Sequence, residues 1–519
     1  MSSTKEFGTV RSYLWPVHLH ELKKFIPMLL IFFLIGFNYS VLRATKDALV
    51  VTAPSSGAEA IPFIKVWAIL PMAFLMTYIF TRVSNALSRE RVFYAMISIF
   101  LAFFILFTFV LYPLRDSLHP HQLADRLQEL LPVGCKGLIA MFRNWTFTAF
   151  YIMSEMWSTI IMTVLGWGFA NEVTSVKDAK RFYGLLGISV NFSGVIAGQV
   201  ATWMSRHEYN PNLPFGSDAW GQSIFMLNSV VVLAGLMCMV LFKLLHSKGL
   251  GYNSQEHTSS QDAKERIKMG MRKNFSYLAK SKYLICIAVI VVTYNIAINL
   301  VEVVWKDQVK QLYPNPNDFN AYMGQVLTGI GVLATVTAIF ISGNVIRRLS
   351  WTASAMIPPL ILLITGIGFF TFLLFKTSSF AMAISSIFGF TPLAIGVFFG
   401  SLQNCLARAS KYTLFDATKE LAFIPLSQES RLKGKAAIDG VGSRLGKSGG
   451  SIIHQGLLVS FGTVSLSTPY VGVILMFAIT AWMFAVRSLG KHFNQLAIDN
   501  EVISVSEEET STSKEQTVV

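Results

Sequence analysis

The stretch NYSVLRATKDALV (residues 38–50) ends an apolar segment with three charged residues, Arg43, Lys46 and Asp47. An ionised side chain at membrane depth costs roughly 3 kcal/mol or more, so such residues usually face a polar cavity and mark a pathway. The pattern returns in INLVEVVWKDQVK, where Lys306-Asp307 repeats Lys46-Asp47. Two half-chains with matching charges at matching depths predict a transporter whose site lies between the halves.

The composition indicates a membrane protein. Of the 519 residues, 53% are hydrophobic, only 14% are charged and 41 are Phe. Apolar runs of about 18 residues or more recur along the whole chain, which is the signal of membrane-spanning helices. This pattern excludes an ordinary soluble protein of several domains and predicts a polytopic, all-α protein in a lipid bilayer.

Twelve spans are predicted at about 25–47, 62–82, 92–112, 137–168, 182–204, 222–245, 281–305, 322–345, 353–375, 380–406, 440–462 and 466–487. Basic residues gather in every second connection, among them Arg89, Lys180 and Arg431. Cytoplasmic loops carry more Lys and Arg, so this asymmetry predicts an even number of spans with both termini in the cytoplasm. The first 24 residues show no signal-peptide pattern, so we expect the first apolar segment to remain as a span.

The chain divides near its middle. The polar, basic stretch 246–280 predicts a cytoplasmic linker between a six-helix bundle at 25–245 and a second one at 281–490. Residues 1–24 are predicted to be a cytoplasmic N-terminus, and the acidic, Ser/Thr-rich end at 491–519 a disordered cytoplasmic tail. A second repeated pattern supports the division into two halves. Lys180, Gly187, Ser193 and Gly194 recur at the same spacing as Lys435, Gly442, Ser448 and Gly449. The loop 113–136 has apolar residues at helical spacing and is either an interfacial helix or a packed loop.

The formal charge of +14 indicates an anionic substrate rather than a nucleic acid, because the cations lie in alternate loops or within the spans. The four cysteines show no CxxC spacing and predict packing roles, with no disulfide and no metal. No cofactor is implied. No Ser-His-Asp grouping stands out, so we expect a protein that is not an enzyme.

Five charged residues in or beside the spans are candidates for substrate binding: Arg43, Lys46, Glu155, Glu302 and Lys306. Arg43 and Asp47 are four apart on a helix and are expected to pair, which leaves Lys46 free, and Glu302 and Lys306 repeat that spacing. The alternative is that these charges snorkel to the membrane interface. Glu155 lies near the centre of TFTAFYIMSEMWSTIIMTVLGWG and cannot snorkel easily, so we expect it to pair with a cation or to gate substrate or proton movement.

The segment ESRLKGKAAIDGVGSRLGKSGGSII (429–453) brings Lys435, Arg444 and Lys447 into or just before the eleventh span. Its Gly-Lys-Ser is not an ATPase P-loop, because the upstream glycines have the wrong spacing and no strand precedes them. Cations beside glycines still suit phosphate, since small residues allow close backbone approach. Asn295, with Asn299, Tyr39 and Tyr294, is expected either to contact a base or to join helices.

Several long motifs carry a family resemblance: LRATKD at 42–47, FIKVWAILP at 63–71, RNWTFTAFYIMSEMW at 143–157, WGFANE at 167–172 and KGKAAIDGVGSRLGKSGG at 433–450. From about residue 11 to 490 the chain resembles the ATP/ADP translocases of obligate intracellular bacteria and plastids, and most closely the chlamydia-type nucleotide transport proteins. The resemblance implies nucleotide exchange through twelve helices similar to the major facilitator architecture. It also implies four site residues, which fall here on Lys46, Glu155, Glu302 and either Lys435 or Lys447.

The resemblance therefore implies an ATP/ADP antiporter that imports host ATP for ADP, with inorganic phosphate as a possible companion ion. Lys46, Arg43, Lys447 and Arg444 would neutralise the phosphates, and Glu155 and Glu302 would pair with those cations when the site is empty. A proton-coupled nucleotide symporter, an exchanger of NAD or another nucleotide, and a membrane enzyme or scaffold are the alternatives. No plastid-type transit extension precedes the first span, so we expect a bacterial inner membrane. We also expect a monomer. The mitochondrial carrier family is excluded because Px[DE]xx[KR] is missing.

Overall fold

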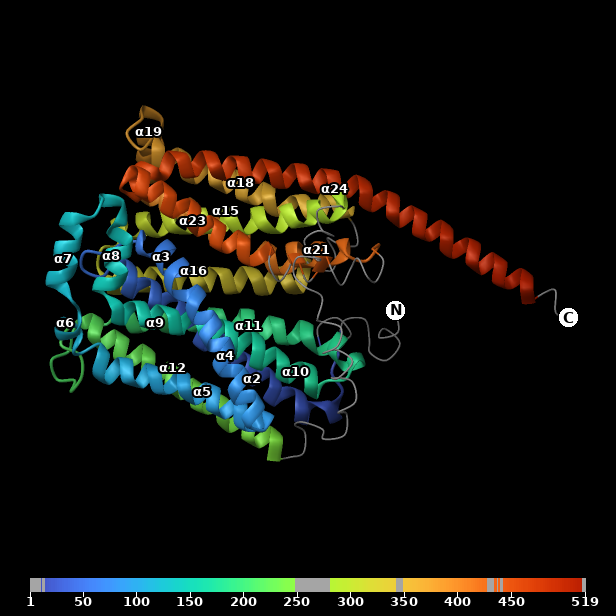
Figure 1. Ribbon diagram of the computed structural model, residues 1–519, viewed down its shortest axis with the longest axis horizontal. Helices are drawn as coiled ribbons and strands as arrows, with labels where there is room; N and C mark the ends of the chain where they lie inside the picture. Colours follow the sequence, from blue (N-terminus) through green and yellow to red (C-terminus); the bar gives the residue numbers. More distant parts are fainter. Residues whose placement is uncertain are drawn as a thin grey trace.

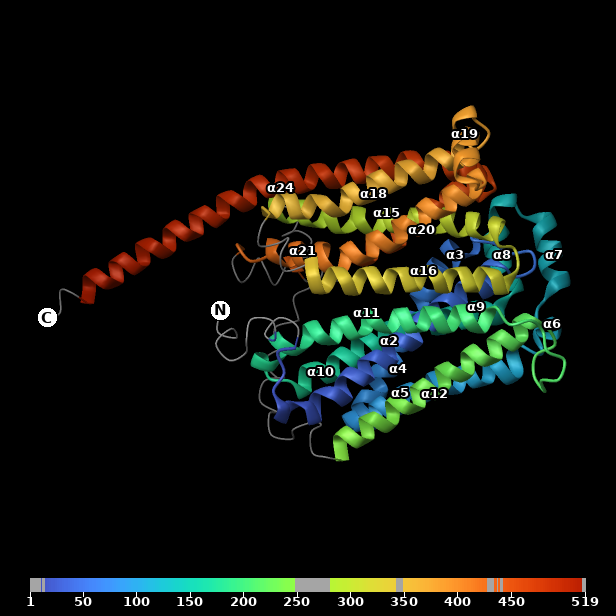
Figure 2. The same cartoon turned by 180° about the vertical axis from the view of Figure 1, so that it is seen from behind.

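The computed structural model describes residue 11 and residues 15–247, 281–341, 349–426, 434, 435, 437, 438 and 442–515. These residues form long helices that lie side by side (Figures 1 and 2). At one end, which we call the terminal end, α2 begins and α24 leaves the bundle. At the other, which we call the loop end, lie the short helices α6, α7, α8 and α19.

The first half of the chain is built around α2. Its elements are η2 (Leu19–Glu21), α2 (Leu22–Val51), α3 (Ala60–Phe63), η3 (Ile64–Ile69), α4 (Leu70–Ala86), α5 (Arg89–Leu106), η4 (Phe107–Leu111), α6 (Arg115–Leu118), α7 (His121–Leu130), η5 (Val133–Cys135), α8 (Lys136–Arg143), α9 (Trp145–Met156), η6 (Trp157–Gly166), α10 (Trp167–Val173), α11 (Val176–Ser205) and α12 (Ala219–Ser247). Helix α2 packs against α9, α11 and α12, so most of its residues from the middle onward are buried.

The second half is built around α15. Its elements are α15 (Lys282–Leu312), α16 (Pro316–Val336), η7 (Thr337–Ile341), α18 (Trp351–Leu374), α19 (Ser379–Phe388), α20 (Pro392–Ser410), η8 (Lys411–Phe415), α21 (Asp416–Ala422), α23 (Ser443–Phe461) and α24 (Val464–Glu515). Helix α15 packs against α20, α23 and α24. Side-chain caps set several helix starts: Ser281 caps α15, and Thr391 precedes Pro392 at the first turn of α20.

Among the described residues, ten helices are long and apolar enough to cross a membrane, and the bent pair Ser379–Phe388 and Pro392–Ala422 makes up to eleven. The predicted count of twelve is therefore not reproduced. Helix α23 occupies the predicted span 440–462 but is not among the ten. Arginine, lysine, histidine, glutamine and several glycines lower its hydropathy, which fits a helix that faces a polar space rather than lipid.

One region differs from the expectation, one agrees with its helical alternative, and others lie outside the described residues. The tail predicted to be disordered continues α24 as helix to Glu515 (Figure 1). An existing helix adds one hydrogen bond for each residue that extends it, and no glycine or proline interrupts residues 491–515. The loop 113–136 contains the helix α7, which an Arg143–Asp125 ion pair of 2.5 Å ties to α8. Residues 248–280 of the linker, and Arg347, Arg348, Arg431 and Lys433, lie outside the described residues.

The two halves meet most closely between α11 and α16. A Cβ on Gly198 would overlap the carbonyl oxygen of Gly324, so the two backbones are in direct contact. Nearer the loop end, Thr202 Oγ1 donates to Ala321 O (3.1 Å) and Asn320 Nδ2 donates to Ser205 Oγ (2.7 Å). Small residues make this approach possible, as in other closely packed membrane helices.

Other contacts between the halves also lie toward the loop end. Lys310 Nζ donates to Ser56 O (2.5 Å), and Gln455 Nε2 donates to Pro62 O (2.9 Å). The backbone of Gly134 in η5 lies against Leu458 of α23. Every hydrogen bond and ion pair between described residues of the two halves lies at mid-depth or nearer this end. The halves are therefore closed against each other at the loop end.

Gly198→Val should open the α11–α16 contact, because overpacking of this kind costs about 1–3 kcal/mol. We expect a lower thermal unfolding temperature for the variant in detergent. The matched control is Gly187→Ala on the same helix, where an added Cβ meets nothing within 4 Å. Equal unfolding temperatures for Gly198→Val and the wild type would show that this contact does not hold the halves together.

Candidate functional site

Lys46 is buried between helices of the first half. Its side chain is 3% exposed, and its Nζ lies 2.9 Å from Glu155 Oε1 and 3.2 Å from Asp47 Oδ1. The same ammonium lies 3.6 Å from the centre of the Tyr151 ring, which is a cation–π distance. Lys46 and Glu155, both predicted from the sequence, are therefore direct partners. The expected pairing of Asp47 with Arg43 is wrong, because Asp47 pairs with Lys46 on its own helix and with Lys306 in the second half.

Lys306 joins this group to the second half. Its Nζ lies 2.8 Å from Asp47 Oδ2 and 2.9 Å from Glu302 Oε1, and both Lys306 and Asp47 are 1% exposed. The predicted Glu302–Lys306 pair at a spacing of four residues is confirmed. Asp47 bridges Lys46 and Lys306, so a carboxylate from α2 holds one lysine from each half.

Lys65 in η3 makes a second connection between the halves. Its Nζ lies 3.1 Å from Glu302 Oε2 and 2.7 Å from Asn299 Oδ1 on α15. Arg408 near the end of α20 adds a longer approach to Glu302 Oε1, at 3.8 Å. Neither Lys65 nor Arg408 was predicted as a site residue. The available signal was the same as for Lys46, a cation within an apolar run, and Lys65 stands inside the motif FIKVWAILP.

We call these seven residues the ion-pair network: Lys46, Asp47, Lys65, Glu155, Glu302, Lys306 and Arg408. Four cations meet three carboxylates in it, so the network keeps an excess positive charge. Breaking a buried ion pair by removing one partner typically costs about 3–5 kcal/mol, because the other charge is left uncompensated. The network therefore favours an anion that can take over the role of a displaced carboxylate.

Three further predicted cations lie apart from any carboxylate. Arg43, Arg444 and Lys447 make no ion pair with another described residue. Lys447 and Arg444 are exposed on α23, and Arg43 is partly exposed on α2. Lys447 lies within electrostatic range of Glu155, and Arg43 within range of Glu302. These cations add uncompensated positive charge beside the network.

The remaining two predicted site residues also lie outside the network. Lys435 Nζ lies 2.5 Å from Glu420 Oε2, and both side chains are nearly half exposed. Asn295 donates to Val291 O in its own helix (2.8 Å), and its Cβ lies against Gly446 of α23. Asn295 therefore serves the contact between α15 and α23, which was the second of the two roles expected for it.

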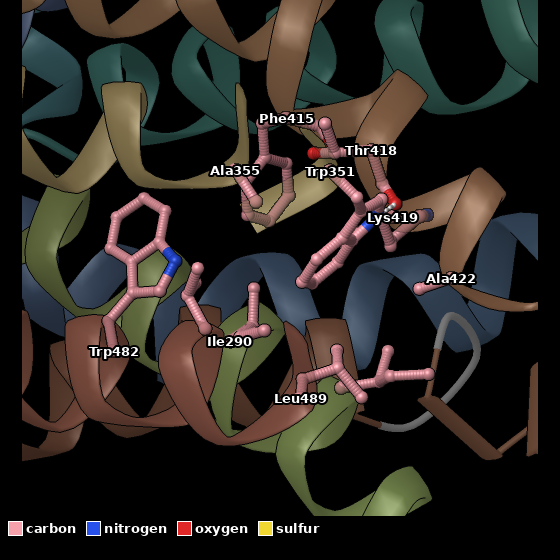
Figure 3. Close-up of a pocket in the computed structure, with 11 residues that line it drawn as sticks. Ile290, Trp351, Ala355, Phe415, Thr418, Lys419, Ala422, Trp482 and Leu489 are labelled. Carbon is pink, nitrogen blue, oxygen red and sulfur yellow. Dashed lines mark hydrogen bonds between the residues drawn. The ribbon is translucent and has the colours of Figure 1, made fainter. Parts of the chain in front are cut away.

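The structure also has an apolar pocket inside the second half, between α15, α18, α21 and α24 (Figure 3). Ile290, Trp351, Phe415 and Trp482 line it. None of the predicted site residues lines this pocket, and Lys419 is its one charged residue. The ion-pair network between the halves is thus the candidate functional site.

Comparison with solved structures shows the fold. A bacterial homologue of the iron transporter ferroportin, described as inward-facing, matches with a TM-score of 0.53 and 13% identity, covering 92% of this chain and 99% of that chain. A D-xylose-proton symporter matches with a TM-score of 0.53 and 13% identity, covering 90% of this chain and 97% of that chain. The expected all-α polytopic fold, similar to that of major facilitator transporters, is confirmed.

Comparison of the sequence shows the family. ADP,ATP carrier protein 1 of Chlamydia pneumoniae is 46% identical over 499 residues, which cover 95% of this chain and 96% of that protein. ADP,ATP carrier protein 1, chloroplastic, of Arabidopsis thaliana is 42% identical and covers 97% of this chain and 78% of that protein. The profile described as TLC ATP/ADP transporter matches residues 1–493. The chain therefore belongs to the TLC ATP/ADP transporter family, as its motifs predicted.

Proposed function

We propose that this protein is an ATP/ADP antiporter, which imports ATP in exchange for ADP by alternating access. The observation that carries the proposal is the buried ion-pair network, which bridges the halves and has more cations than carboxylates. The relatives at 46% and 42% identity are named ADP,ATP carrier proteins, which supports the choice of nucleotides as substrates.

The phosphates of an incoming nucleotide first meet the unpaired cations. Arg43, Arg444 and Lys447 have no carboxylate partner among the described residues, so an incoming polyanion meets them without first displacing a carboxylate. Charge-assisted hydrogen bonds to phosphate are roughly twice as strong as neutral ones. Deeper contact requires the phosphates to compete with Glu155, Asp47 and Glu302 for the network lysines.

That competition explains why exchange would be obligatory. Lys306–Asp47 and Lys65–Glu302 join the two halves while the loop end is closed. Opening the loop end breaks both pairs, and each hydrogen bond between charged groups contributes about 1.5–3 kcal/mol. A bound nucleotide supplies replacement negative charge, whereas an empty carrier has none. The loaded carrier therefore reorients, and the empty carrier stays closed.

The proposal includes the membrane in which the protein lies and its orientation there. We place the protein in a bacterial inner membrane as a monomer with both termini in the cytoplasm. With this orientation the loop end lies on the outer side of the membrane, and the structure is closed toward that side. Inorganic phosphate travelling with ADP would balance the extra negative charge of ATP, and the unpaired cations supply binding capacity for it.

Labelled ATP uptake into proteoliposomes tests this function. Vesicles loaded with ADP should take up ATP many times faster than empty vesicles, and a protonophore should not change the rate. Uptake into empty vesicles that a protonophore abolishes would instead identify a proton-coupled nucleotide symporter. Trans-stimulation by NAD but not by ADP would identify a different nucleotide exchanger.

A further inference from the structure

Three residues of α2 form one stripe along the helix. Arg43 follows Tyr39 by four residues and Lys46 follows it by seven, so all three lie on one face. Because α2 runs from the terminal end toward the loop end, depth increases from Tyr39 to Lys46. Lys46 is buried in the ion-pair network, while Arg43 and Tyr39 are partly exposed. Along this stripe the ammonium of Lys46 lies deepest, and the ring of Tyr39 lies nearest the terminal end.

The second half offers a matching arrangement on α20 and η8. Arg408 points to Glu302, and Tyr412 follows it by four residues, one turn nearer the terminal end. The Tyr412 side chain is 49% exposed, and Lys411 Nζ lies 4.8 Å from the centre of its ring. Tyr412 belongs to η8, a π-helical segment, and such segments occur frequently at functional sites.

The two tyrosines share surroundings although they come from different halves. Tyr412 lies within electrostatic range of Tyr39 and Arg43 on α2, and of Lys447 on α23. The exposed ring of Tyr412 therefore lies near residues of both halves. Lys411 approaches the ring, and about half of Tyr412 remains exposed beside the unpaired cations.

On this basis we infer that Tyr412 stacks on the purine of the bound nucleotide, with Tyr39 beside it and the phosphates deeper, on Arg43. The inference rests on the proposed nucleotide transport and adds the orientation of the substrate. A nucleotide has an aromatic base at one end and a polyanion at the other. The site has the same order, with tyrosine rings nearer the terminal end and cations deeper. The reverse orientation would press the purine against buried ion pairs and leave Arg43 without phosphate.

Two ligands separate base binding from phosphate binding in the purified full chain. Tyr412→Ala should weaken ATP binding by about 10-fold or more, the range measured for base–aromatic stacking. Tripolyphosphate carries the phosphates without a base, so its affinity should stay at the wild-type value. Tyr412→Phe keeps the ring and should bind both ligands as the wild type does. Isothermal titration calorimetry in detergent measures all of these affinities.

The matched control is Tyr209→Ala, because Tyr209 is 47% exposed and lies outside the spans. Unchanged ATP affinity in Tyr412→Ala, or an equal loss for ATP and tripolyphosphate, would overturn the stacking. Tyr412→Leu, which keeps the bulk without the π face, replaces the alanine variant if that variant does not reach the membrane. A wild-type chain that binds no ATP would contradict the proposed function itself. A wild type that binds ATP but not tripolyphosphate would overturn the deep placement of the phosphates.

Discussion

Lys46→Ala is expected to reduce ATP/ADP exchange by roughly 100-fold or more, because about 3 kcal/mol is lost with a buried charge partner. In the structure Lys46 is the one cation within 4.0 Å of Glu155 among the described residues, whereas Asp47 keeps Lys306. The variant therefore leaves one buried carboxylate without a partner and removes one phosphate ligand. Exchange in ADP-loaded proteoliposomes measures the loss, after normalising to the amount of inserted protein.

Lys46→Arg should recover little of this activity. The ammonium of Lys46 is a point charge that contacts Glu155, Asp47 and the Tyr151 ring at once, and a planar guanidinium cannot reproduce that geometry. The matched control is Lys243→Ala, which removes an exposed lysine from α12 and should transport normally. Exchange at a normal rate in Lys46→Ala would remove Lys46 from the site.

The charged residues of the site could be predicted from the sequence better than the ion pairs that they form with one another. Lys46, Glu155, Glu302 and Lys306 were found because each is a charge inside an apolar run, which is costly unless a polar site compensates it. Their pairing depends on the packing of α2 against α9 and α15, which periodicity within one helix does not reveal. For this reason Asp47 was assigned to Arg43, four residues away, rather than to Lys306 in the other half.

The two missed cations do not differ from the predicted lysines in their sequence positions. Lys65 lies inside a predicted span and Arg408 just beyond one, as Lys46 and Lys306 do. Both side chains turn to Glu302 on another helix, a contact that spacing along one segment does not reveal. Lys435 was weighed as a phosphate ligand, but Glu420 neutralises it in the structure. The polar composition of α23 likewise explains both its low hydropathy and its position beside the network.

Asp47→Asn is expected to weaken the coupling of import to export. The substitution keeps the shape of the side chain and removes the charge that joins Lys306 of one half to α2 of the other. Hydrogen bonds to charged groups contribute about 1.5–3 kcal/mol, so the barrier to reorienting the empty carrier should fall by a comparable amount. The ratio of uptake into ADP-loaded vesicles to uptake into empty vesicles should therefore fall about 10-fold or more.

The choice of Asp47 limits damage to the fold, because Lys46 keeps Glu155 and Lys306 keeps Glu302 as partners. The control is Glu420→Gln, which removes ion pairs with Lys419 and Lys435 that lie within the second half. If the pair between the halves prevents the empty carrier from moving, only Asp47→Asn raises uptake into empty vesicles. An Asp47→Asn variant whose two uptake rates fall in proportion would show that Asp47 stabilises the fold without controlling reorientation. Obligatory exchange would then need a different explanation, and Lys65–Glu302 would be the remaining pair between the halves to test.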